Sequence, residues 1–204
     1  MKLIDFLRKE CVVPNAKFQD KSEALLQIAK IAKNSSILEN VDTQVLTEKL
    51  QDRETLGSTG FGNGIAIPHC KVKGIDDFVV GLVTVEDGVD FDALDNQKVQ
   101  LIVFIIAPDG KSNEHIRLLS SISQALLHPG AIKEMLSAQN SEVLTESFLR
   151  HTRADITTEE KPAKSLFHIF VQDEGIFREI AQVLAEIDPN SLVFLDAENA
   201  GPYL

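Results

Sequence analysis

The stretch RETLGSTGFGNGIAIPHCK, residues 53–71, decides how the rest of the chain is interpreted. Its four glycines, at positions 57, 60, 62 and 64, let the backbone adopt positive φ and expose its amide groups. We expect a short apolar strand over residues 65–67. Pro68 fixes φ and lacks an amide hydrogen, so the strand should stop there. The imidazole of His69 is therefore predicted to stand at a strand end, within reach of hydrogen-bond donors.

The side chains of this stretch favour phosphate chemistry. A neutral histidine ring can accept a phosphoryl group or bind a metal ion near neutral pH. Arg53 supplies a fixed positive charge, and the hydroxyls of Thr55, Ser58 and Thr59 can bind phosphate oxygens together with glycine amides. The pattern predicts a phosphohistidine site on His69.

Other interpretations of the same residues stay open at this point. A histidine beside a glycine-rich loop can be an ordinary surface residue. Nucleotide binding is disfavoured, because no Lys-Ser/Thr pair follows the glycines and residues 60–64 do not satisfy Gly-x-Gly-x-x-Gly. The remaining histidines, at positions 128, 151 and 168, are assigned to no chemistry, and we predict neither a metal site nor a cofactor.

Several segments of the first 150 residues carry a longer signature. These segments are residues 53–54, 58–60, 62–69, 91–95 and 114–119. Together they resemble the fructose/mannitol-type (type 2) enzyme IIA domains of the bacterial phosphoenolpyruvate-dependent sugar phosphotransferase system, including the nitrogen-regulatory branch. The chain departs from this signature at Cys70, where the family usually has a small residue such as glycine.

The resemblance implies roles for particular residues. It implies that His69 carries the phosphoryl group and that Arg53 and His115 lie at the same site. It also implies the phosphocarrier protein as donor, and a IIB domain or a regulated protein as acceptor.

The resemblance leaves more than one function open. We favour a nitrogen-regulatory phosphoryl carrier, because nothing in the sequence resembles a IIB cysteine motif or a membrane IIC segment. The alternative is the IIA component of a fructose or mannitol transport system. A remote alternative is a binding module of the same fold that is not phosphorylated.

Composition narrows the class of partner. The chain has 204 residues, of which 44% are hydrophobic and 25% charged, as in an ordinary globular protein. With 31 acidic against 20 basic residues, the net charge of -11 disfavours nucleic acid and anionic membranes. No apolar run approaches the roughly 20 residues of a membrane span, so we expect a cytoplasmic protein without membrane insertion. Cys11 and Cys70 should be reduced there.

Apolar patterning predicts an α/β fold. Two runs rich in β-branched residues, 78–85 and 99–107, are hydrophobic almost throughout, which is typical of strands covered on both faces. We therefore expect a central mixed β-sheet with helices on both faces. The helices are expected at residues 21–33, 42–53, 114–127, 131–138 and 142–149.

Two finer expectations concern the segments around these strands. Glu86-Asp87-Gly88 is typical of a turn after the first strand. In the helix from 114, apolar residues including Ile116 and Ile122 should face the sheet. His115 would then lie in the first turn of that helix, beyond a strand end, where α/β sheets place their ligand sites.

The C-terminal quarter differs from the rest. We expect an enzyme IIA-like domain over residues 1–150, a polar linker at 151–164 and a small βαβ unit at 165–204. The order of elements in this unit resembles the opening half of a ferredoxin-like domain, of which it would be a fragment. A unit of about 40 residues cannot readily bury its own helix. It should therefore pair with another subunit, pack on the first domain or continue into a longer domain, so a homo-oligomer is an open expectation.

Overall fold

Two long apolar strands form the centre of the sheet. In the computed structural model, strand β5 (Val79–Val89) runs antiparallel to strand β6 (Val99–Pro108), with Leu82 opposite Val103. Nearly every residue of both strands is buried, as expected for β-branched residues covered from above and below. The two predicted strands are thus confirmed.

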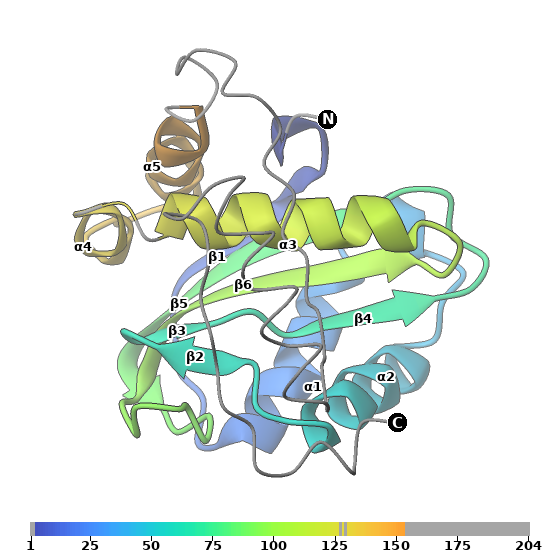
Figure 1. The fold of residues 1–204 in the computed structure, drawn as a ribbon, viewed down its shortest axis with the longest axis horizontal. Helices are drawn as coiled ribbons and strands as arrows, with labels where there is room; N and C mark the ends of the chain where they lie inside the picture. Colours follow the sequence, from blue (N-terminus) through green and yellow to red (C-terminus); the bar gives the residue numbers. More distant parts are fainter. Residues whose placement is uncertain (1–2, 127, 129, 154–204) are drawn as a thin grey trace, which may run out of the picture. The chain divides into compact units, whose positions relative to one another are not determined.

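The other strands complete a mixed six-stranded sheet (Figure 1). Their order is β1-β5-β6-β3-β2, and β4 also pairs with β6. The remaining strands are β1 (Leu7–Ala16), β2 (Gly60–Gly62), β3 (Ile65–Ala66) and β4 (His69–Val72). β1 runs parallel to β5, and β3 and β4 both run parallel to β6. The predicted mixed sheet is confirmed.

Pro68 interrupts a strand rather than ending it. Before the break Ala66 pairs with Ile102, and after it His69 pairs with Ile105, so β6 keeps the same register with β3 and β4. The amide of Ile105 donates to the carbonyl of Pro68 at 3.1 Å. Proline has no amide hydrogen to donate to a neighbouring strand, but its carbonyl can still accept. At Pro68 this carbonyl makes the hydrogen bond to β6. His69 therefore stands at a strand end, as predicted, and the structure adds that this end is the start of β4, which pairs with β6 again after the break.

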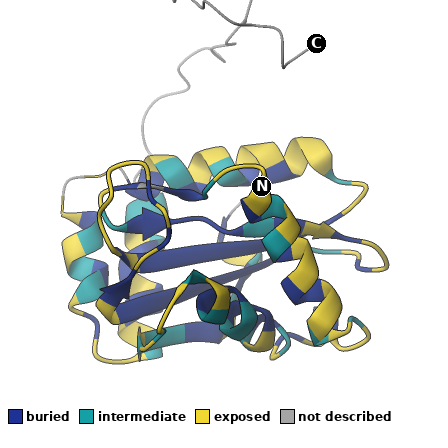
Figure 2. Cartoon of the chain, turned by 90° about the horizontal axis from the view of Figure 1, so that it is seen from below, coloured by how far each residue is buried: buried dark blue, intermediate teal, exposed yellow. Residues whose placement is uncertain are grey.

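Helices cover both faces of this sheet (Figure 1). Helices α1 (Lys21–Ala32) and α2 (Thr43–Thr55) pack in one hydrophobic cluster, which includes Ile102 and Phe104 of β6. The opposite cluster holds Leu101 and Val103 of the same strand with α3 (Ser112–Leu126), α4 (Ala131–Leu136) and α5 (Ser141–Arg153). Two short 3-10 turns, Leu3–Asp5 and Ser36–Leu38, complete the fold. Strands lie buried between helices with exposed outer sides (Figure 2).

Local side-chain chemistry fixes where the first two helices begin. The carboxylate of Asp20 accepts from the amide of Glu23 at 2.8 Å, and that of Asp42 accepts from the amide of Gln44 at 2.6 Å. Both aspartates are N-caps, which satisfy amides that have no partner in the helix. The predicted helix starts are confirmed.

Two predictions about local structure are wrong. Glu86-Asp87-Gly88 lies within β5, where the register with β6 shifts between Thr84 and Val89 and Gly88 takes a φ of 67°. The polar residues mark an irregularity in a strand that continues. Ile116 does not face the sheet, since 65% of it is exposed.

The structure describes residues 3–126, 128 and 130–153. Most of the predicted linker and the whole predicted βαβ unit at 165–204 lie outside the described residues. The domain boundaries therefore stay predictions. Among the helices that the structure describes, none is long and apolar enough to cross a membrane.

A test of the sheet uses Gly81 in β5. A Cβ atom there would lie 2.2 Å from the ring of Phe104 and 2.5 Å from the carbonyl oxygen of Cys11. We expect Gly81→Ala to lower the free energy of unfolding by at least about 1–3 kcal/mol, because the backbone of β1 cannot give way locally. Denaturant unfolding measures this.

Gly110→Ala is the matched control, since a Cβ at Gly110 meets nothing within 4 Å. It should change the free energy of unfolding by less than about 0.5 kcal/mol. Equal stability of the two variants would contradict the close packing of β1, β5 and β6.

Candidate functional site

The backbone around Pro68 sets the orientation of the His69 ring. Its Nδ1 lies 2.8 Å from the carbonyl oxygen of Ile67. A carbonyl oxygen only accepts, so Nδ1 carries the proton in this contact. The neutral ring then has its lone pair on Nε2. A histidine ring held in one tautomer by a second partner is oriented for chemistry at its other nitrogen.

Arg53 approaches that free nitrogen. It lies in the last turn of α2, where its Nε donates to Nε2 of His69 at 3.1 Å. Its Nη1 donates to the carbonyl of Gly57 at 3.1 Å. Two different nitrogens of the rigid guanidinium are thereby fixed. A permanent positive charge lies directly beside the lone pair of His69.

His115 reaches the same place from the opposite layer. It lies in the first turn of α3 and is 5% exposed. Its ring centroid is 5.2 Å from that of His69, and the two rings are inclined by 67°. Its Nε2 is buried and has no hydrogen-bond partner among the residues that the structure describes. The structure thus brings Arg53, His69 and His115 together, and their roles stay predictions.

Lowered pKa values favour the neutral form of both rings. Burial lowers the pKa of His69 below its ordinary value; the carbonyl of Ile67 acts in the opposite direction, and the charge of Arg53 lowers it further. Burial also lowers the pKa of His115 to about 4, helped by His69, Lys71 and Arg53. Near pH 7 the lone pair on Nε2 of His69 is therefore available as a nucleophile.

The segment of residues 91–95 holds the glycine-rich loop in place. The amide of Leu94 donates to the carbonyl of Gly60 at 3.0 Å, and the amide of Asn63 donates to a carboxylate oxygen of Asp95 at 2.8 Å. A Cβ on Gly60 would lie 3.1 Å from that of Ala93, closer than real Cβ contacts normally come. Glycine is needed here because the two segments lie so close together.

The three predicted phosphate-binding hydroxyls all donate to protein acceptors. Thr55 is exposed and donates to the carbonyl of Asp52, and Ser58 donates to the carbonyl of Phe91, both at 2.6 Å. Thr59 is buried and donates to the carboxylate of Glu54. Any of them would have to change partner to donate to a phosphate, and their phosphate-binding role stays a prediction.

Sequence reasoning missed an ion pair beneath this loop. Nζ of Lys21, the first residue of α1, lies 2.7 Å from the carboxylate of Glu54, whose side chain is only 5% exposed. The local sequence gives one hint that a carboxylate lies close to the site, because Glu54 follows Arg53 directly near the end of α2. Nothing in the sequence pointed to Lys21 as its partner.

Cys70, where the sequence departs from the family signature, points away from the site. It packs in the cluster under α1 and α2, because successive side chains of a strand face opposite sides. Burial raises the pKa of its thiol to about 12, so the thiol stays neutral. Cys11 is also buried, and both cysteines are free.

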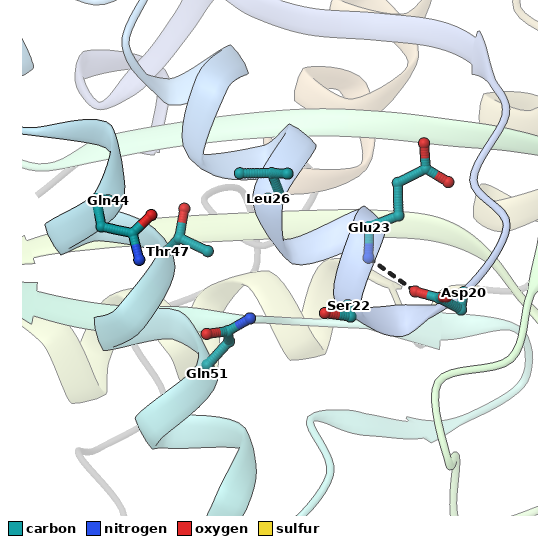
Figure 3. A pocket seen from close by; sticks show the side chains of 7 residues that line it. All are labelled: Asp20, Ser22, Glu23, Leu26, Gln44, Thr47 and Gln51. Atoms are coloured by element: carbon teal, nitrogen blue, oxygen red, sulfur yellow. Dashed lines mark hydrogen bonds between the residues drawn. The ribbon is translucent and has the colours of Figure 1, made fainter.

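Other candidate binding places carry little chemistry. A surface hollow of about 380 Å³ between α1 and α2 is lined by residues including Asp20, Glu23 and Gln51 (Figure 3). Asp20 and Glu23 already accept from backbone amides, and neither His69 nor His115 lines the hollow. Within residues 3–126, 128 and 130–153, no group of three or more His, Cys, Asp and Glu could hold a metal ion.

Comparison with known proteins agrees with this architecture. Residues 5–151 match the family model described as "Phosphoenolpyruvate-dependent sugar phosphotransferase system, EIIA 2". A nitrogen regulatory protein of Pseudomonas aeruginosa is 39% identical over 124 residues, which are 61% of this chain and 79% of that protein.

Two solved structures share the fold. The nitrogen regulatory protein IIA-Ntr of Neisseria meningitidis superposes with a TM-score of 0.65 at 24% identity, covering 71% of this chain and 97% of that one. The mannitol enzyme IIA of Escherichia coli, solved in complex with phosphorylated enzyme IIB, gives a TM-score of 0.59 at 21% identity, covering 70% and 98%. The match to the family model spans well over half of the chain, and the chain therefore belongs to the EIIA 2 family of the phosphoenolpyruvate-dependent sugar phosphotransferase system.

Proposed function

We propose that this chain is a phosphoryl carrier that accepts a phosphoryl group on Nε2 of His69. One observation carries the proposal. The neutral ring has its Nδ1 proton bound by the carbonyl of Ile67, and its other nitrogen faces the guanidinium of Arg53. This arrangement combines a nucleophile of fixed orientation with a charge that stabilises phosphoryl oxygens.

The transfer exchanges one phosphorus–nitrogen bond for another. The Nε2 lone pair of His69 attacks the phosphorus of a phosphohistidine on the phosphocarrier protein, in line with the bond that breaks. The bonding electrons of that bond return to the donor ring. No proton moves, because His69 keeps its Nδ1 proton, and the carbonyl of Ile67 stabilises the positive charge that the ring acquires.

Arg53 and His115 receive the new phosphoryl oxygens. The Nε hydrogen of Arg53, which points at Nε2 before transfer, is placed to donate to an oxygen afterwards. His115 with its proton on Nε2 donates to another oxygen. That bond gives this buried nitrogen a partner, which it lacks among the described residues.

The onward role that we favour is nitrogen-type regulation, in which the phosphorylation state of His69 controls binding to another protein. The Pseudomonas aeruginosa relative is named a nitrogen regulatory protein. Two exposed apolar side chains lie close to site residues in the sequence. Leu56, three residues after Arg53, is 83% exposed, and Ile116, directly after His115, is 65% exposed. We propose that these two side chains contact the partner protein. We also propose that this relay operates in the cytoplasm, and that the C-terminal unit at residues 165–204 can join copies of the chain into a homo-oligomer.

The second candidate is the IIA component of a fructose or mannitol transport system. Its support is the fold shared with the mannitol enzyme IIA, which was solved in complex with phosphorylated IIB. Incubating the phosphorylated chain with isolated fructose-type and mannitol-type IIB domains separates the two candidates. Rapid transfer of the phosphoryl group to a IIB cysteine favours transport, and its retention on His69 favours regulation.

Substitution of His69 tests the carrier function. With phosphoenolpyruvate, enzyme I and the phosphocarrier protein, we expect the unaltered chain to gain one phosphoryl group and His69→Gln to gain none. Intact-mass spectrometry at alkaline pH, which preserves phosphohistidine, measures the gain. His128→Gln is the matched control and should be labelled fully. Normal labelling of His69→Gln would refute the assignment, and no labelling of the unaltered chain would favour an unphosphorylated binding module.

Arg53→Lys tests the guanidinium. Lysine keeps the charge, but its ammonium cannot reproduce the fixed fork that reaches His69 and Gly57 together. We expect phosphoryl transfer to His69 to slow by at least about tenfold, the value of one hydrogen bond to a charged group. Rapid-quench kinetics measures the rate. Arg150→Lys, at an arginine 67% exposed and paired with Glu134, should leave it unchanged; an equal effect of both substitutions would contradict the role of Arg53.

The lowered pKa of His69 sets the pH dependence. Above the pKa, Nε2 keeps its lone pair; below it, a proton occupies that position and attack stops. Because the pKa of His69 is lowered from 6.5, transfer should persist through pH 7 and fall only below pH 6.5. His115, with a pKa of about 4, stays neutral throughout this range. NMR titration of the two rings checks the order, and a pKa of His69 above 6.5 would contradict it.

A further inference from the structure

The carboxylate of Glu54 is buried at the end of α2, directly after Arg53 in the chain. It accepts from the amide of Thr59 at 3.1 and 3.3 Å and from the hydroxyl of the same residue. Its only charged partner among the described residues is Lys21, at 2.7 Å. A buried carboxylate is tolerated when it is paired and hydrogen-bonded, and Glu54 meets both conditions.

Lys21 links three separate parts of the chain. Its Nζ lies 2.7 Å from Glu54 and 3.3 Å from the carboxylate of Asp92, and 5.2 Å from the centre of the Phe91 ring. The carbonyl of Phe91 in turn accepts from Ser58 in the glycine-rich loop. The start of α1, the end of α2 and residues 91–92 are therefore joined at one ammonium group.

These contacts reach the reacting nitrogen through the loop. Glu54 holds Thr59 over the end of α2, and the segment between them contains Gly57, whose carbonyl accepts from Nη1 of Arg53. That contact fixes one side of the guanidinium, while its Nε donates to His69 on the other. The amide of Gly57 also donates to the carbonyl of Glu54 at 3.2 Å. Releasing Thr59 would leave this single backbone bond to hold the Gly57 carbonyl, and one of the two restraints on the guanidinium would weaken.

Charge gives the ion pair a second role. A carboxylate without a partner beside Arg53 would compete with the phosphoryl group for the guanidinium and would repel the phosphoryl oxygens. Lys21 neutralises Glu54 and thereby leaves the guanidinium available.

We propose that Glu54 is a positioning residue that fixes the loop at Thr59 and so orients Arg53 toward His69, and that Lys21 is the cation that keeps Glu54 from opposing phosphoryl transfer. The kinetic part of this proposal rests on the proposed carrier function. The positioning part does not, because it concerns the contact between Arg53 and His69 in the free protein.

The first measurement is hydrogen exchange at Arg53 in the full chain without phosphorylation. NMR follows the exchange of the Arg53 Nε hydrogen with water, which the contact with His69 slows. We expect Glu54→Ala to speed this exchange by at least about tenfold, because alanine leaves the amide and the hydroxyl of Thr59 without their acceptor. Glu86→Ala is the matched control, since Glu86 pairs with Lys17 at 3.0 Å on an exposed surface. Unchanged exchange in Glu54→Ala would overturn the positioning role.

The second measurement is the rate at which His69 is phosphorylated by the phosphocarrier protein. We expect Lys21→Met to slow it by at least about tenfold, and Lys17→Met to leave it unchanged. Adding Glu54→Gln to Lys21→Met should restore part of the rate, because glutamine removes the unpaired charge and keeps a side-chain oxygen that accepts from Thr59. A purely structural ion pair predicts the reverse, a double variant as slow as Lys21→Met or slower, and that result would overturn the electrostatic role.

Two further results keep the test decisive. Lys21→Arg preserves the charge and should transfer within about twofold of the unaltered chain, so it decides the role of Lys21 even if Glu54→Gln does not fold. If the unaltered chain takes up no phosphoryl group, the carrier function fails, while the exchange rate of the Arg53 Nε hydrogen still tests the role of Glu54.

Discussion

The pairing of β6 with two short strands across Pro68 is the constraint on which the site depends. Because β3 and β4 keep the same register along β6, both ends of the break are held by one central strand. The carbonyl of Ile67, which lies between β3 and β4, accepts a hydrogen bond from Nδ1 of His69. A backbone irregularity thereby decides which ring nitrogen carries the proton. The glycine-rich loop and the helices act on a ring whose orientation is already set.

The same placement explains how residues from both helical layers meet. α2 belongs to the layer on one face of the sheet and α3 to the layer on the other (Figure 1). Among the strands that the structure describes, β4 pairs with β6 alone, so His69 lies at an edge of this sheet that both layers can reach. Arg53 approaches the ring from α2 and His115 from α3. A protein of net charge -11 thus concentrates a cation and two imidazoles at one partly buried edge, where electrostatic interactions are stronger than in water.

Sequence patterns succeeded where one local property decides the structure and failed where two competed. The starts of α1 and α2 were predicted to within one residue and the continuously apolar strands were predicted correctly, because helix starts and burial on both faces leave direct signals. Ile116 was misplaced because the inward side of α3 is set by His115, Leu118 and Ile122 together. Ile116 was predicted to point inward from its apolar character alone, whereas the packing of α3 buries His115 and leaves Ile116 exposed.

The sequence by itself determined the α/β class, the family and the importance of residues 53–71, since these follow from periodicity and from a long local signature. Only the tertiary structure decided the tautomer of His69, the partners of the three hydroxyls and the pairing of Lys21 with Glu54. The physical reason is that these features depend on contacts between segments far apart in the chain or on the local path of the backbone. The register of β6 and the packing of α1 against α2 fix those positions, and neither is encoded in any single stretch of sequence.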